Sequence, residues 1–552
     1  MLLPNCIIVF CLTICVCIYA KAQTVTIDNL QTDELLRLHQ LMGNKDDRSF
    51  TIKPVNINNV QDDSIAGNVK SSAAAFSFLK VKGLIKALPL DWVQEYNSDH
   101  PYGWNDGAMI PARGYQTLFS TGFYFRWGIL SMQLKPEFVY AVNNNFQTFS
   151  TAQPDNTWAI YSSNFLNWID EPEQFGTGPY KKGYPGQSNI KLRAGKFSIG
   201  VSTENIWWGP GIRNSMMLSN AAPGFPHFSL QTDRPLHTFL GTLEMQLIGG
   251  QLIHSGILPP DTTRLFYGSR IYQPKPDDWR YFSGVTLSWQ PKWIPGLYLG
   301  IIRNVYEYSS EMNSTAGLLK YFPVFQKIFV SGGYSAIDNQ DQLGSLYFRY
   351  VFPKNHFECY AEYARNDHSQ NIRDLVTEPE HSRAFMVGAQ KLISLRHPNH
   401  FLGFMTEMTH MQLPLDYLVR TDPTFYIHSI VVDGYTNYGQ MMGAGIGPGS
   451  NLLTADFFLL SNTHKIGLMF EKYDHNMDFY QEAFSATITK PWTDFSLTAH
   501  GNLTAGHFQM NGELAVIYSQ NYEWWKTSAT SFVPGYKDVT QVHAKLSLRY
   551  FW

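Results

Sequence analysis

The sequence predicts an all-β chain: a transmembrane antiparallel β-barrel of the outer-membrane type, preceded by a short, partly helical N-terminal segment. Three observations predict it. Apolar and polar residues alternate over most of the chain, charged residues reach only 16% while aromatic residues reach 15%, and the chain ends on an alternating apolar strand. Soluble chains carry roughly 25% charged residues, whereas strands with one lipid-facing wall carry fewer. The mean hydropathy of −0.21 excludes a bundle of transmembrane helices.

The alternating segments begin near Tyr115 and continue to the end of the 552-residue chain. They run for about 9–11 residues, the length that a tilted strand needs to cross a bilayer. Their ends carry Trp and Tyr, as the interfacial girdles of barrels do. At roughly 25 residues per strand and connection, residues 113–552 hold about 16–20 strands, an even number in a bacterial barrel. A soluble sandwich or propeller gives the same alternation and is the alternative.

The last strand gives the sharpest pattern. Its apolar residues face one way and its polar residues the other; the apolar set is Val542, Ala544, Leu546, Leu548, Tyr550 and Trp552, and the polar set is His543, Lys545, Ser547 and Arg549. In a soluble protein such an edge would invite aggregation. The strand resembles the closing strand of bacterial outer-membrane barrels, where a terminal aromatic residue helps the insertion machinery to recognise the chain.

Residues 1–22 read as a signal peptide. An apolar run over residues 2–19 precedes Ala20-Lys21-Ala22, a small-x-small cleavage site, so the mature chain is expected to begin at Gln23. Four of the five cysteines lie in this segment, which leaves Cys359 alone in the mature chain. No intramolecular disulfide and no cysteine metal site can therefore form. The predicted location is the outer membrane of a Gram-negative cell.

Residues 23–112 form the expected N-terminal periplasmic segment, and residues 113–552 the expected barrel. Residues 33–42 predict a short helix with its leucines near one face. Residues 71–88 are ambiguous: they suit a helix ended by Pro89, or an extended strand.

Three stretches interrupt the alternation with Gly, Pro, Asn and aromatic residues: 97–114, 202–230 and 434–452. Aromatic faces stack on sugar rings, and Asn or Arg side chains bond sugar hydroxyls or acidic groups. Loops folded into a wide barrel to fill its lumen would have the same composition. The candidates for polysaccharide binding or for a lumen plug are Trp104, Asn105, Asp106, Asn205, Trp207, Trp208, Arg213, Asn214, Asn220, Tyr435 and Asn437.

At these stretches the sequence resembles the Wzi-type capsule assembly proteins of Gram-negative bacteria. The best match is Glu204-Asn205-Ile206-Trp207-Trp208-Gly209-Pro210-Gly211 followed by Leu218-Ser219-Asn220-Ala221-Ala222-Pro223-Gly224-Phe225-Pro226. The first stretch resembles the form in Bacteroidetes-like members. The resemblance implies a barrel of about eighteen strands, a helical periplasmic element, and a non-enzymatic, lectin-like role with no cofactor. The implied partners are capsular or other exopolysaccharide, outer-membrane lipids and the barrel insertion machinery, and no nucleic acid.

Two alternatives remain. A porin or oligosaccharide channel would have an open lumen lined by opposed charges. A barrel-wall hydrolase could pair Ser and His from distant strands, although no catalytic motif predicts it. Glu407 and His410 do not form a metal pair, because residues three apart in a strand point to opposite faces.

Overall fold

The computed structural model describes residues 23–25, 30–44, 46–57, 73–78, 81–312, 314–325, 339–366, 380–414, 424–461, 464–484, 490–525 and 535–552. The expected signal peptide, residues 1–22, lies outside these ranges. The largest sheet closes on itself to form an antiparallel barrel of 18 strands. The predicted fold class is confirmed.

Successive strands of the wall pair with their neighbours along the chain. β7 and β8 both pair with β6, β10 pairs with β7, and β9 pairs with β8. β7 and β8 therefore make one interrupted strand of the wall, and β9 and β10 make the next. β13 and β14 both pair with β15. The wall consists of β5 (Val81–Asn97), β6 (Gly114–Trp127), β7 (Leu130–Leu134), β8 (Glu137–Ala141), β9 (Tyr180–Tyr184), β10 (Asn189–Ala194), β11 (Phe197–Ser202), β13 (His227–Thr232), β14 (Leu236–Thr238), β15 (Gly241–Leu252), β18 (Arg280–Pro291), β19 (Leu297–Tyr308), β20 (Gln340–Phe352), β21 (Phe357–Asn366), β22 (Arg383–Ser394), β23 (Phe401–His410), β26 (Asn451–Leu460), β27 (Lys465–Asp474), β28 (Thr493–Ala505), β29 (Phe508–Gln520) and β30 (Val539–Tyr550).

The remaining elements are short. The strands are β1 (Gln23–Val25), β2 (Ile52–Lys53), β3 (Val55–Ile57), β4 (Ala73–Phe78), β12 (Trp207–Trp208), β16 (Leu265–Phe266), β17 (Ser269–Arg270), β24 (Thr436–Asn437) and β25 (Gln440–Met441). The α-helices are α2 (Leu30–Leu41), α4 (Asp155–Tyr161) and α6 (Met477–Phe484). Single turns of 3-10 or π helix are η1 (Ser162–Asn167), η2 (Ser309–Glu311), η3 (Ser314–Tyr321), η4 (Pro323–Phe325), η5 (Pro353–Asn355) and η7 (Tyr522–Trp524). None of the described helices is long and apolar enough to cross a bilayer.

The barrel closes between β5 and β30, which pair from Leu90 with Tyr550 to Asn97 with His543. The wall therefore begins at Val81, and the expected boundary at residue 113 is corrected. The sequence left the start of this strand undecided, because Pro89 suited the end of a helix as well as an extended strand. The register with β6 shifts between Leu88 and Asp91, where Pro89 lies, as expected of a proline in a strand. Of the two readings of residues 71–88, the extended one holds for the described part.

Each wall strand has an outer and an inner face. In β30, Val542 and Leu546 point outward and are exposed, whereas His543 and Arg549 point inward and are buried. Other strands follow the same rule, so the outer face carries large apolar side chains such as Phe457, which is 58% exposed. The structure thus confirms the alternation that the sequence predicted. An apolar outer face is what a membrane-spanning barrel presents to lipid.

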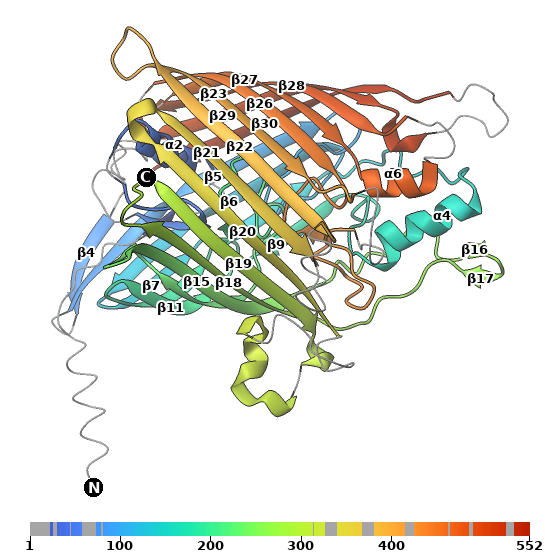
Figure 1. The fold of residues 1–552 in the computed structure, drawn as a ribbon, viewed down its shortest axis with the longest axis horizontal. Coiled ribbons are helices and arrows are strands. Elements are labelled where there is room, and N and C mark those ends of the chain that lie inside the picture. Colours follow the sequence, from blue (N-terminus) through green and yellow to red (C-terminus); the bar gives the residue numbers. More distant parts are fainter. Residues whose placement is uncertain are drawn as a thin grey trace.

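The two ends of the barrel differ. Connections are short at one end, such as residues 506–507, and long at the other, such as residues 142–179. We call these the short-turn end and the long-loop end. The C-terminus lies at the short-turn end, and α4 and α6 lie at the opposite end (Figure 1). In outer-membrane barrels, short turns face the periplasm and long loops face the outside.

Helix α2 confirms the helix predicted near residues 33–42, but it lies inside the barrel. Leu35, Leu38 and Leu41 are buried against inward side chains of the wall near the short-turn end, including Tyr298 and Phe458. The leucines recur at helical spacing, so they form one apolar face. The helix thus fills the lumen at the short-turn end and is not a separate periplasmic element.

A buried group of charges fixes α2 to the wall. Arg37 Nε donates to Glu358 at 2.8 Å, and Arg349 donates to the same carboxylate at 2.8 Å through Nε. Arg37 also donates to the carbonyl of Pro210 at 2.7 Å. The carboxylate lies between the two guanidinium groups, so each of these buried cations has an ionic partner. The helix is therefore joined both to the wall and to the stretch that contains Trp207 and Trp208.

Candidate functional site

The second Gly/Trp-rich stretch lies within the lumen. Trp207 and Trp208 form β12, which pairs with β2 through Lys53 and Ile52. Both indoles are buried, at 1% and 0% exposure. Trp208 Nε1 donates to Gln246 of β15 at 2.7 Å. This pair of tryptophans is therefore packed between an N-terminal strand and the wall, away from solvent.

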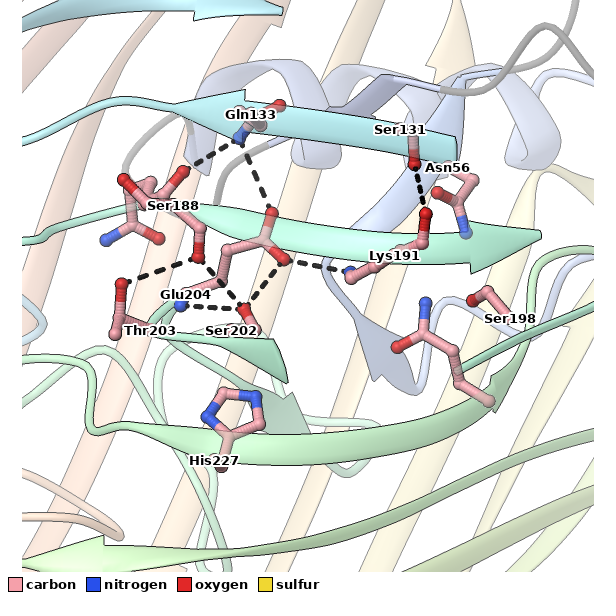
Figure 2. A network of polar contacts seen from close by, with 12 residues as sticks. Asn56, Ser131, Gln133, Ser188, Lys191, Ser198, Ser202, Thr203, Glu204 and His227 are labelled. Atoms are coloured by element: carbon pink, nitrogen blue, oxygen red, sulfur yellow. Dashed lines mark hydrogen bonds and ion pairs between the residues drawn. The ribbon is translucent and has the colours of Figure 1, made fainter. Parts of the chain in front are cut away.

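The start of this stretch is anchored to the wall by a polar network (Figure 2). Lys191 Nζ donates to the Glu204 carboxylate at 2.9 Å, and Ser202 Oγ donates to it at 3.1 Å. Thr203 Oγ1 donates to the Ser188 carbonyl at 3.4 Å. Lys191 and Glu204 are both buried, so the ion pair sets where the chain leaves β11 and turns into the lumen.

A carboxylate of the wall holds the turn that follows Trp208. Glu407 of β23 accepts hydrogen bonds from the backbone N–H groups of Ile212, Arg213 and Asn214 at 2.7, 3.1 and 2.8 Å. Tyr360 of β21 donates to the same carboxylate at 2.9 Å. Three consecutive N–H groups form an anion-binding concavity, and here the anion is a side chain of the barrel. Glu407 points inward and His410 outward, as predicted.

The first stretch packs on the second through asparagine amides. Asn220 Nδ2 donates to the Asn105 carbonyl at 2.8 Å, and Asn105 Nδ2 donates to the Arg213 carbonyl at 2.9 Å. Within the second stretch, Asn205 Nδ2 donates to the Ala222 carbonyl at 2.7 Å. These amides satisfy backbone carbonyls that the irregular chain would otherwise bury without a partner.

The third stretch joins the same body. Asn437 Nδ2 donates to the Pro223 carbonyl at 3.0 Å, and Tyr435 OH donates to the Met217 carbonyl at 2.7 Å. Asn304 of β19 donates to Tyr435 OH at 2.8 Å. All three stretches, which we call the lumen plug (residues 97–114, 202–230 and 434–452), thus contact one another. Inward side chains of β15, β19, β23 and β27 contact the plug from different sides of the barrel.

The charged candidates of the plug are already paired. Arg213 Nε and Nη2 donate to the Glu471 carboxylate at 2.7 and 3.0 Å, and its guanidinium lies 4.4 Å from the Trp104 ring centroid. Asp106 forms an ion pair with Lys545 of β30. Asn214 is fully buried. Most of the eleven candidates are buried and contact other parts of the protein, as residues of a plug would, while Trp104 Nε1 and Trp207 Nε1 have no hydrogen-bond partner among the described residues.

A pocket that the sequence did not indicate opens at the long-loop end. It has a volume of about 210 Å³. Four long connections and the start of the first plug stretch line it: His100, Pro101, Pro111, Phe146, Tyr161, Phe165, Glu171, Pro172, Glu173, Ile446, Gly447, Pro448, Ser450, Tyr473, His475, Asn476, Trp492, Tyr522, Glu523 and Trp524. We call it the long-loop pocket. Its residues are scattered over four hundred positions, and only the aromatic run 522–525 offered a local signal.

Aromatic rings form much of its wall. The rings of His475 and Trp492 stack with centroids 3.6 Å apart, and His100 stacks on Tyr522 at 4.1 Å. Trp492 also contacts Tyr522 and Trp524 edge to face, at 5.0 and 5.3 Å. Rings held by several neighbours are rigid, so they offer a preformed apolar surface to a ligand.

Three carboxyl groups line the same pocket. Burial raises the pKa of Glu171 to about 7, and Asp170 adds to the shift. Burial also raises the pKa of Glu173, which accepts a hydrogen bond from Tyr161 OH. Burial and the nearby carboxylates Glu173 and Asp494 hold the pKa of Glu523 well above its usual range. Burial therefore disfavours the ionised form of all three carboxyl groups.

Two further features mark the pocket. Asn521, Glu523 and Trp524 have positive φ angles of 50°, 56° and 47°, a conformation that non-glycine residues adopt at a cost and that clusters at functional sites. Asn476 Nδ2 and Trp524 Nε1 are buried and donate to no atom of the described residues. Among those residues, no group of three His, Cys, Asp or Glu is placed to hold a metal ion.

A model of the family described as capsule assembly protein Wzi matches residues 102–529. The chain is similar to the outer-membrane protein Wzi of Escherichia coli, described as a carbohydrate-binding β-barrel involved in group 1 capsule assembly. That structure is 12% identical, with a TM-score of 0.60 over 96% of this chain and 99% of that one. OccAB2 of Acinetobacter baumannii and OpdQ of Pseudomonas aeruginosa are 11% and 10% identical, with TM-scores of 0.40 and 0.37 over 84% of this chain and 97% of each of theirs. No curated protein sequence matches.

Proposed function

Because this chain belongs to the capsule assembly protein Wzi family, we propose that it acts in the outer membrane to attach or assemble surface polysaccharide without catalysing a reaction. The single observation that carries the proposal is the arrangement along the barrel axis. Packed side chains of the plug and α2 occupy the lumen, and an aromatic pocket opens at the long-loop end. Such an arrangement suits binding at the outer surface.

The same observation weighs against a porin or oligosaccharide channel. A diffusion pore needs a continuous aqueous path lined by charges. Here Trp208 and Tyr435 are buried in one cluster with inward side chains of the wall, such as Phe282 and Tyr306. We therefore place glycan contact at the long-loop pocket and give the plug residues a positioning role.

The chemistry of the pocket suits a sugar. Trp492, which is half-buried, offers an apolar surface to the C–H face of a pyranose, and the almost fully buried rings of Tyr522 and Trp524 hold it in place. The carboxyl groups of Glu171 and Glu523 have no hydrogen-bond partner within the described residues and can accept from hydroxyl groups. Asn476 and Trp524 provide donors that the described part of the fold leaves unused.

The test combines a deletion strain with defined variants. We expect deletion to reduce the polysaccharide retained on the cell, measured by capsule staining, and the wild-type gene to restore it. Trp492→Ala should restore less, while its matched control, Trp293→Ala, should restore fully because Trp293 lies exposed at the short-turn end. Heat-modified migration on gels checks that each variant forms a barrel. Unchanged retention in the deletion strain, together with no binding of exported glycan by purified protein, would refute the proposal.

A further inference from the structure

We propose that the long-loop pocket takes an amino-bearing sugar unit and rejects acidic ones. The inference rests on the proposed function and names the class of sugar that this pocket can hold. It follows from an imbalance in the lining: Glu171, Glu173 and Glu523 line the pocket, but no Lys or Arg of the described residues does. The two histidines that line it are each engaged by another carboxylate.

The engagement of those histidines is specific. His475 Nε2 lies 2.9 Å from Asp494 Oδ2, and His100 Nδ1 lies 3.1 Å from Asp99 Oδ2. The other ring nitrogen of His100 lies 3.2 Å from Ser519 Oγ. Neither imidazole is therefore available as a counter-charge for an anionic ligand. Arg213, the one basic residue among the eleven candidates, is paired with Glu471.

An ammonium group meets two favourable surroundings in this pocket. Binding of an ammonium group favours the ionised form of these carboxyl groups, which then accept its hydrogen bonds. Trp492, which is half-buried, can attract a cation through the negative face of its ring, whereas Tyr522 and Trp524 are almost fully buried. Aromatic walls together with carboxylates are the usual composition of sites that recognise ammonium groups.

A sugar carboxylate meets the opposite. Burial in the pocket raises the pKa of its carboxyl groups, that of Glu171 to about 7, and the same burial opposes the entry of another anion. Among the residues that the structure describes, no Lys or Arg lines the pocket, so no ion pair with them can offset the loss of the anion's hydration. We expect an acidic unit to bind at least about tenfold more weakly than the same unit with an amine.

The test uses the purified full chain in detergent and isothermal titration calorimetry with matched tetrasaccharides. Tetramers of glucosamine and of N-acetylglucosamine differ only in the amine, and a tetramer of galacturonic acid supplies the acidic case. We expect the glucosamine tetramer to bind at least about tenfold more tightly than the acetylated one, and the galacturonic acid tetramer to bind most weakly. The double variant Glu171→Gln with Glu523→Gln should remove the preference, whereas Glu380→Gln, an exposed glutamate, should preserve it.

Each other outcome overturns the inference. Equal affinity for the two matched tetramers refutes the amine preference, and tighter binding of the acidic tetramer refutes the rejection of anions. Binding that is indifferent to the double variant places the sugar outside the pocket. Absence of binding by all three probes shows that the pocket takes no such sugar, while loss of polysaccharide from the deletion strain would still support the proposed function.

Discussion

Replacing Glu407 with Gln should loosen the lumen plug while leaving the barrel intact. The Glu407 carboxylate accepts the N–H of Asn214 at 2.8 Å on one oxygen, and the N–H of Ile212 at 2.7 Å and Tyr360 OH at 2.9 Å on the other. An amide offers one oxygen and one NH2 group. In either orientation, at least one buried backbone N–H faces an NH2 donor.

The cost follows from these contacts. One buried donor without an acceptor costs about 1–3 kcal/mol, and the remaining bonds lose the extra strength that a charged acceptor gives. We expect the plug to be destabilised by about 2–5 kcal/mol in total. A loss of 2 kcal/mol raises the population of locally opened plug by roughly 30-fold.

Hydrogen exchange measured by mass spectrometry reports this opening. In Glu407→Gln, amides within residues 202–230 should exchange at least about 30-fold faster than in the wild type, while amides of the wall strands should stay protected. Glu380→Gln, a substitution at a side chain that is 61% exposed, is the matched control and should exchange like the wild type. Exchange of residues 202–230 within threefold of the wild type, a margin of roughly 0.7 kcal/mol, would refute the anchoring role of Glu407.

Other predictions concern the plug, the helix and the pocket. The wild-type protein should show no steady ohmic conductance in planar bilayers, and an open-pore current would contradict a packed lumen. Trp207→Ala with Trp208→Ala removes two buried indoles, each worth about 3–5 kcal/mol, and should lower barrel assembly or polysaccharide retention; normal values of both would exclude these residues from either role. Glu358→Gln leaves two buried guanidinium groups without their carboxylate and should release α2, at a cost of about 3–5 kcal/mol, seen as faster proteolysis near the N-terminus. Burial raises the pKa of Glu171 to about 7, so its contribution to stability is present below the unfolded pKa near 4.5 and is lost as the pH rises through 7. The melting temperature of the long-loop end should therefore fall over that pH range, and Glu171→Gln should make it less dependent on pH.

The sequence predicted the barrel wall well because each wall strand has one lipid-facing side. In a strand such as β30, apolar side chains must face the lipid and polar side chains the lumen, so the two kinds alternate. This pattern lies within one short segment and can be recognised in the sequence. The same reasoning left β5 undecided, because Pro89 suited a helix end as well as a strand; the register of β5 with β6 shifts at this point. It also placed Glu407 and His410 correctly on opposite faces of their strand. It could not identify the partner of Glu407, the backbone of Asn214, because the two residues lie about two hundred positions apart in the chain.

The plug and the pocket show a similar contrast. Trp207 and Trp208 lie in one stretch dense in Gly and Pro, so the irregular segment was visible, and both of its possible roles could be named. The contacts that these residues make inside the protein support our proposal that they act as a plug, and those contacts join segments far apart in the chain. The long-loop pocket has no counterpart in any single segment: Glu171, Trp492 and Glu523 meet because three distant loops converge at one end of the barrel.

The pairing of β5 with β30 has a consequence for the order of folding. The plug stretch 202–230 leaves the wall between two early strands, yet it is anchored by Glu407 and Glu471 of later ones. The same closed wall surrounds α2. Both must enter the cylinder while its seam is open, because a complete wall leaves no lateral route inward. Entry of the plug and closure of the barrel are therefore coupled. A chain whose plug fails to dock would keep the edges of β5 and β30 unpaired, and the cell's quality-control machinery could recognise these open edges.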